Sequence, residues 1–204
     1  MNKWNAIKKW MMACMVASVV WMGCGEDTPA NLPQNPVVSS ATLYDMGDEI
    51  ISALKKSDWE KFAAYFHPTE GVRFSPYAYV NTVTDVCLTR DEFLNFAKSG
   101  NVIVWGEFDG TGDTIRYNLN DYVKRFVMDK PYDTVTERTL NNYVHHGSSL
   151  DNLREIYPDV EVVEYYVPGT EEYAQMDWGQ LKLVFKMDAN KFYLIAVIHN
   201  VWTT

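Results

Sequence analysis

Residues 181–202 constrain the fold most, because they carry the pattern of a long β-hairpin. Apolar residues alternate with lysines from Leu181 to Lys186, the period of two expected for a strand with one buried face. Residues 188–190, Asp-Ala-Asn, have the composition of a tight turn. Residues 192–202 are apolar at most positions, as in a central strand that is covered on both faces. The chain is therefore expected to build a sheet around its C-terminal hairpin.

Helical patterns precede this sheet. Residues 42–56 place apolar side chains on one helical face, and residues 57–66 continue with a second, aromatic stripe. Residues 72–80 then alternate with a period of two, which predicts the first strand. Pro76 has no backbone N–H to donate, so this strand is expected to be an edge strand or to be bulged or broken there. Further segments predict a helix and several strands (90–99, 102–108, 114–118, 160–167).

Helices early in the chain and antiparallel strands late in it predict the α+β class. The segments 42–66, 72–80 and 181–202 resemble the nuclear transport factor 2 / ketosteroid isomerase superfamily. That resemblance implies N-terminal helices packed on a curved antiparallel sheet, in a cone that leaves a pocket. Residues 109–158 depart from it, because they are longer than such a fold needs.

A second resemblance comes from short stretches in the same region. Residues 67–80, Trp105-Gly106 and residues 198–202 resemble a group of uncharacterised bacterial secreted proteins. This resemblance implies no activity.

The first residues have the pattern of an export signal. Three lysines precede an uncharged apolar run at residues 10–22, which is shorter than the ~20 residues that a membrane span needs. The run ends in Gly23-Cys24, which resembles the bacterial lipoprotein signal, with Cys24 as the lipidated N-terminus of the mature chain. Trp21 departs from the Leu-like residue usual at that place. The alternatives are an ordinary secretory peptide and an uncleaved anchor helix.

These features predict a signal peptide at residues 1–23, a polar, proline-containing tether at 24–40 and one α+β domain at 41–204. Signal removal takes three lysines from the 18 basic residues, so 15 remain against 27 acidic residues, a formal charge of −12. Such a charge disfavours nucleic acid and anionic headgroups as partners. Membrane attachment through the lipid, with palmitate among its acyl chains, is expected at the bacterial cell envelope, on the periplasmic or cell-surface side.

The polar positions of the first strand form one candidate ligand site. Arg73, Tyr77 and Tyr79 would share a face of residues 72–80 if the alternation continues through Pro76. An arginine with two tyrosines suits a carboxylate, a phosphate or a sugar. The alternative is an ordinary solvated strand face, on which Arg73 pairs with a nearby acid.

His199 is a weak candidate for a catalytic residue. If Met187 pairs with Lys191, then His199 lies opposite Gly179, which leaves space beside an ionisable ring on the most apolar face. A register slip of one residue would remove that arrangement. The alternative is a core histidine with satisfied hydrogen bonds.

The remaining polar clusters predict local structure more strongly than chemistry. His67 precedes Pro68 at a helix end, where a cation would favour the helix dipole. His145 and His146 are adjacent, so on a strand they would face opposite ways and could not share a metal. Residues 109–113 could offer oxygen ligands to calcium, but a hairpin turn is the stronger interpretation. No metal site and no cofactor is predicted, since no Walker loop, nucleophile elbow, His-Glu-x-x-His sequence or cysteine pair occurs.

Three hypotheses on function follow. The first is a lipid-anchored, non-enzymatic domain that binds a small ligand or an envelope protein through a cone pocket. The second is an isomerase, dehydratase or hydrolase that uses His199 as base, with Tyr77 or Arg73 as electrophilic partner. The third is a purely structural envelope component.

Overall fold

The computed structural model describes residues 40–135, 138–143, 146–147 and 150–203. The helices in these residues are α1 Ser40–Lys55, α2 Trp59–Ala63, α3 Arg90–Ser99, α4 Leu119–Tyr122 and α5 Leu153–Ile156. There are also a π-helix, η1 Val123–Val127, and two 3-10 turns, η2 Tyr132–Thr134 and η3 Glu171–Tyr173. The strands are β1 Val72–Ser75, β2 Val86–Leu88, β3 Ile103–Glu107, β4 Thr114–Tyr117, β5 Arg138–Leu140, β6 Glu161–Val167, β7 Gly179–Asp188 and β8 Lys191–Val201.

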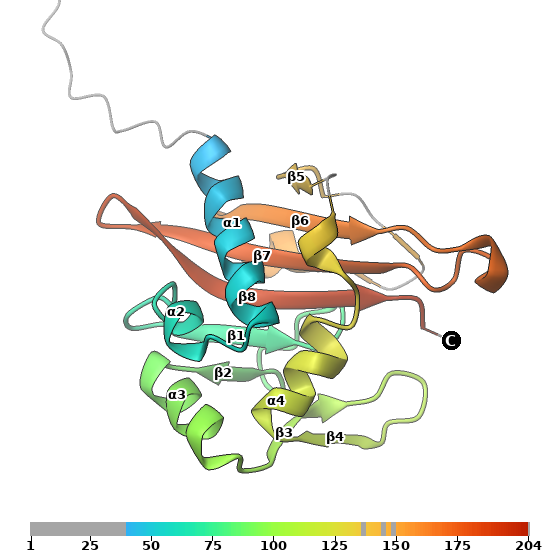
Figure 1. Cartoon of the computed structure of the whole chain (residues 1–204), viewed down its shortest axis with the longest axis horizontal. Coiled ribbons are helices and arrows are strands. Elements are labelled where there is room, and N and C mark those ends of the chain that lie inside the picture. The colour runs from blue at the N-terminus through green and yellow to red at the C-terminus, as the bar shows by residue number, and fades with distance from the viewer. Residues whose placement is uncertain (1–39, 136–137, 144–145, 148–149, 204) are drawn as a thin grey trace, which may run out of the picture. The chain divides into compact units, whose positions relative to one another are not determined.

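Six strands form one curved sheet in the order β2-β1-β8-β7-β6-β5, and β3 and β4 form a separate hairpin (Figure 1). All pairs in the large sheet are antiparallel except β1 and β8, which run parallel. Helix α1 crosses the sheet, and its Gly47 lies so close to Tyr165 of β6 that an added Cβ would be 2.5 Å from the tyrosine oxygen. The expected α+β class, with N-terminal helices packed on a curved sheet, is confirmed.

The C-terminal hairpin has the expected strands but a different register. Its turn contains two residues, Ala189 and Asn190, both with positive φ (46° and 64°), so Asp188 pairs with Lys191. Positive φ at both positions matches the twist that a two-residue hairpin requires. A register shift between Phe185 and Val184 then places Leu181, rather than Gly179, opposite His199. The expected pairing was therefore wrong, because neither the turn type nor the shift can be seen in the alternation of apolar residues.

Strand β1 ends at Ser75, immediately before Pro76. It lies between β2 and β8 in the sheet, so it is an inner strand, and the proline breaks it. Residues 76–79 form bends rather than a strand, and the predicted strand over 72–80 is correct only in its first half. Beyond this break, the side chains no longer alternate between the two faces of the sheet as they do in a strand.

Aromatic side chains fill the space between the helices and the sheet. Phe74 of β1 contacts the rings of Phe62, Phe66, Phe93, Trp105 and Tyr122, with centroids 5.8 to 6.4 Å apart. The Trp105 and Tyr122 rings stack at 3.7 Å. The space between the helices and the sheet is therefore filled by a packed core. The groove described below lies outside this core.

The other face of the sheet is also covered. Val162 belongs to a second apolar cluster with Leu153 of α5, whereas the next residue, Val163, belongs to the main core. Adjacent strand residues point to opposite faces, so α5 packs on the face away from the main core. Part of the long region 109–158 thus covers this face.

None of the helices in the described residues has the length and apolar character that a membrane span requires. The apolar run at 10–22 lies outside the described residues.

Candidate ligand-binding groove

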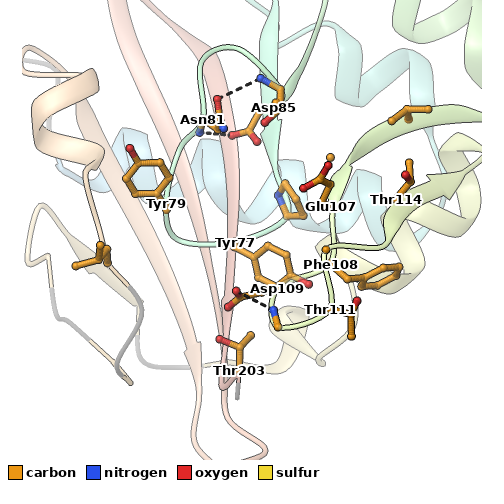
Figure 2. A pocket seen from close by; sticks show the side chains of 17 residues that line it. Tyr77, Tyr79, Asn81, Asp85, Glu107, Phe108, Asp109, Thr111, Thr114 and Thr203 are labelled. Carbon is orange, nitrogen blue, oxygen red and sulfur yellow. Dashed lines mark hydrogen bonds between the residues drawn. The ribbon is translucent and has the colours of Figure 1, made fainter.

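A groove of about 1020 Å³ lies between the segment that follows β1 and the β3–β4 hairpin. Figure 2 shows Tyr77, Tyr79, Asn81 and Asp85 on the first wall and Glu107 and Thr114 on the second. The lining residues are Pro76, Tyr77, Tyr79, Asn81, Thr84, Asp85, Val104, Gly106, Glu107, Phe108, Asp109, Gly110, Thr111, Gly112, Thr114, Leu150 and Thr203.

Asp85 organises the first wall. Its carboxylate accepts hydrogen bonds from the Ser75 hydroxyl and, at 2.8 Å, from the Asn81 backbone N–H. Asn81 in turn accepts from the backbone N–H groups of Val83 and Thr84, at 3.0 and 3.2 Å. Burial raises the pKa of Asp85, although the bonds from Ser75 and Asn81 and the charge of Arg73 oppose this shift. The wall is a loop closed by its own side chains.

Arg73 is separated from the groove by this loop. Its Nη1 donates to the backbone carbonyls of Asp85, at 2.9 Å, and Thr82, at 3.3 Å. It is not among the groove-lining residues, so it does not converge there with Tyr77 and Tyr79. The shared polar face does not form, because Pro76 ends the strand before the alternation reaches Tyr77. Arg73 supports the wall instead.

Both candidate tyrosines line the groove, in different states. Tyr77 is half-buried, and its ring packs edge-on against Phe126 at 6.1 Å. Burial raises the pKa of Tyr77, and a hydrogen bond with the Asp109 backbone opposes this rise. Tyr79 is 52% exposed, so its ring is available to a ligand. One ring is thus held in place and the other is open to solvent.

The second wall carries the predicted turn at residues 109–113. Asp109 accepts a hydrogen bond from the Gly110 N–H at 3.0 Å, and the Phe108 N–H donates to Asp113 at 2.7 Å across the hairpin. Gly110 and Gly112 have φ of 83° and 71°, which glycine adopts without strain. The segment is therefore the connection between β3 and β4, as predicted.

His199 lies outside the groove and is 2% exposed. Its Nδ1 is 2.9 Å from the Pro76 carbonyl oxygen, and its Nε2 is 3.2 Å from Asp129 Oδ2. The expected space beside the ring, opposite Gly179, is absent because Leu181 is its partner on β7. A substrate could not reach this imidazole without a large rearrangement.

The other histidines have structural surroundings. His67 Nδ1 lies 3.1 Å from the Glu70 backbone N–H, which can only donate, so this nitrogen accepts and is unprotonated. His67 therefore caps the turn at residues 67–70 through Nδ1, as a hydrogen-bond acceptor. The His146 ring stacks on Tyr166 at 3.9 Å. His145 and Cys24 lie outside the described residues.

Sequence reasoning missed Asp85, Glu107 and Phe108 as groove residues. Asp85 is eight residues after Tyr77, and its distance to the groove depends on the loop that it closes with Ser75. Glu107 and Phe108 come from the β3–β4 hairpin, which no local pattern places beside β1. A polar residue flanked by turn-forming residues, such as Asp85 after Asn81, was the one available signal.

No family model matches the chain, and no curated protein matches it. The fold is similar to that of a solved structure from Xanthomonas campestris, assigned as a calcium/calmodulin dependent protein kinase II association domain. The two are 14% identical with a TM-score of 0.32, and the match covers 79% of this chain and 84% of that one. A likeness at this level gives no basis for transferring a function.

Proposed function

We propose that this domain binds a small neutral or positively charged ligand in the groove and does not transform it. The observation that carries this proposal is the chemistry of the lining. Two tyrosines and Phe108 offer aromatic faces, and Asp85, Glu107 and Asp109 offer carboxylates. Among the described residues that line the groove, none is basic.

This lining discriminates between ligand classes. Aromatic faces attract organic cations and stack on the apolar faces of sugar rings. The exposed carboxylates of Glu107 and Asp109 can accept hydrogen bonds from hydroxyl or amine groups, but they repel carboxylates and phosphates. The arginine that would have attracted an anion is bonded to loop carbonyls instead. Sugars and amines are therefore favoured over anions.

The alternative enzyme hypothesis rests on His199, and its burial argues against that role. A general base must come within hydrogen-bond reach of the proton that it abstracts. The ring is enclosed by Pro76, Asp129 and Phe126 and contributes nothing to the groove lining. A binding role agrees better with this arrangement.

The groove proposal predicts a specific loss on removal of the exposed ring. Tyr79→Ala should weaken binding of choline or cellobiose by about 10-fold, equivalent to ~1.4 kcal/mol, because one aromatic face is lost. Isothermal titration calorimetry measures the change, with succinate as an anionic probe that should not bind.

Tyr173→Ala is the matched control, because Tyr173 is similarly exposed but lies outside the groove. Its affinity should equal that of the unmodified protein. Equal losses in both variants, or tight binding of succinate alone, would refute the proposed groove.

The N-terminal sequence pattern supports a location for this binding domain at the cell envelope. We expect the chain to be a bacterial lipoprotein with a nuclear transport factor 2-like domain, which residues 24–40 tether to the envelope membrane through Cys24. Mass spectrometry of the protein isolated from membranes should show an N-terminal Cys24 with acyl mass. An unmodified Cys24, or an intact residue 1, would reject the anchor and leave the groove proposal standing.

A further inference from the structure

His199 and Asp129 form a buried pair directly behind the groove. Their side chains are 3% and 12% exposed, and Nε2 and Oδ2 lie 3.2 Å apart, within ion-pair distance but without the alignment of a hydrogen bond. Asp129 Oδ1 also accepts from the Tyr132 hydroxyl at 3.3 Å. None of these side chains lines the groove itself.

The partners of the ring show which nitrogen donates toward the groove. A backbone carbonyl can only accept, so the contact of Nδ1 with the Pro76 oxygen requires a proton on Nδ1. Burial alone would raise the pKa of Asp129, but its interactions with His199, Lys130 and Tyr132 outweigh burial and lower it. The Nδ1–H group therefore faces the Pro76 carbonyl, and Nε2 lies beside the Asp129 carboxylate.

Two contacts connect this pair to the groove. Pro76 is itself a wall residue, and its carbonyl, held by His199, lies where the chain leaves β1 toward Tyr77. The Phe126 ring packs edge-on against His199 at 5.8 Å and contacts the groove residues Tyr77 and Phe108 at 6.1 and 6.0 Å. The Pro76 carbonyl and the Phe126 ring, which packs on two groove residues, thus both contact the same buried imidazole.

We infer that His199 is a positioning residue for the groove, and that its Nδ1–H bond to the Pro76 carbonyl sets the course of residues 76–85. The inference rests on the proposed ligand-binding function of the groove. It assigns to His199 no contact with the ligand. Asp129 lies beside the other edge of the ring at Nε2, and the bond to Pro76 is the part that reaches the groove.

Substituting His199 by Asn or by Gln distinguishes the roles of its two ring nitrogens. In Asn the side-chain N–H group occupies the place of Nδ1, and in Gln it occupies the place of Nε2. Both substitutions are made together with Asp129→Asn, so that no buried carboxylate is left beside a neutral amide side chain. H199N/D129N therefore keeps a donor for Pro76, whereas H199Q/D129N does not, and the two proteins are otherwise closely matched.

Hydrogen exchange of the backbone amides of residues 77–85 is the first readout, because it needs no ligand. H199Q/D129N should exchange there at least 10-fold faster than the unmodified protein, and H199N/D129N should stay within about 3-fold. The affinities for choline and cellobiose should follow the same order. Exchange in β6 and β7 should stay unchanged in both, which shows that each variant is folded.

Equal effects of the two double variants on the amides of residues 77–85, whether large or absent, would overturn the inference. So would faster exchange in H199Q/D129N with an unchanged affinity. If neither probe binds the unmodified protein, the proposed function fails, and the exchange comparison by itself then decides whether His199 positions the loop.

Discussion

Lys182→Met is expected to lower the free energy of unfolding by about 3–5 kcal/mol, because it leaves the buried Glu164 and the partly exposed Asp151 without their cation. Lys182 is 1% exposed on β7 and pairs with Asp151. It also opposes the effect of burial, which raises the pKa of Glu164 on the neighbouring strand. Glu164 is further held by the Gln180 side chain and the Tyr143 N–H, each at 2.8 Å. Chemical denaturation with urea, monitored by tryptophan fluorescence, measures the loss.

The effect should depend on pH in a definite direction. The pKa of Glu164 is higher in the folded protein than in an unfolded chain, so folding becomes more favourable as the pH falls toward the ordinary carboxyl range. Without Lys182, burial disfavours the ionised form of Glu164 more strongly. The destabilisation by Lys182→Met should therefore be largest near neutral pH and shrink toward about pH 4–5.

Lys186→Met supplies the matched control on the same strand. Lys186 pairs with Glu70, but its side chain is 41% exposed and that of Glu70 is 46% exposed. Exposed pairs contribute about 0–1 kcal/mol, so this variant should lose less than that. Similar losses in both variants would show that the pair formed by Lys182 behaves as a solvated one, contrary to its burial.

Phe74→Ala is expected to cost about 3–5 kcal/mol through the cavity that it leaves. Phe74 is fully buried at the centre of the aromatic core, where it stacks on Phe93 and meets Trp105 edge-on. The surrounding rings come from helices, from the β3–β4 hairpin and from Phe66 just after α2, and rigid rings collapse poorly into a cavity. Urea denaturation at neutral pH measures the change.

Tyr79→Ala removes a ring only five residues further along and serves as the control for stability. Because Tyr79 is half-exposed and contributes to the groove rather than the core, its loss should change the free energy of unfolding by less than about 1 kcal/mol. A loss after Phe74→Ala no greater than that after Tyr79→Ala would contradict the central place of Phe74 in the core.

The order and type of the main elements could be predicted because they depend on local periodicity. The helices at the start of the domain and the long C-terminal hairpin were found from the spacing of apolar residues. The register of that hairpin was not, because two residues with positive φ and one irregularity shift the pairing without changing the spacing. The turn and the irregularity each shift the register by one residue, and together they change the partner of His199 from Gly179 to Leu181.

The candidate site was predicted in part. Tyr77 and Tyr79 line the groove, and Arg73 lies behind it. The error has a single cause, which is that an alternating pattern was extended through Pro76, where the strand ends. The carboxylates of the opposite wall could not be predicted, since they belong to a hairpin that is distant in sequence.

The sequence by itself determined the α+β class, the positions of the principal helices and strands, and the acidic character of the chain, because each depends on residues close together or on composition. Tertiary structure decided which polar residues are buried. Lys182 sits in an alternating pattern that predicts exposure, yet α5 and the chain around it cover that face. The partners of His199 are 70 and 123 residues away, so only the packing of distant segments could define its role.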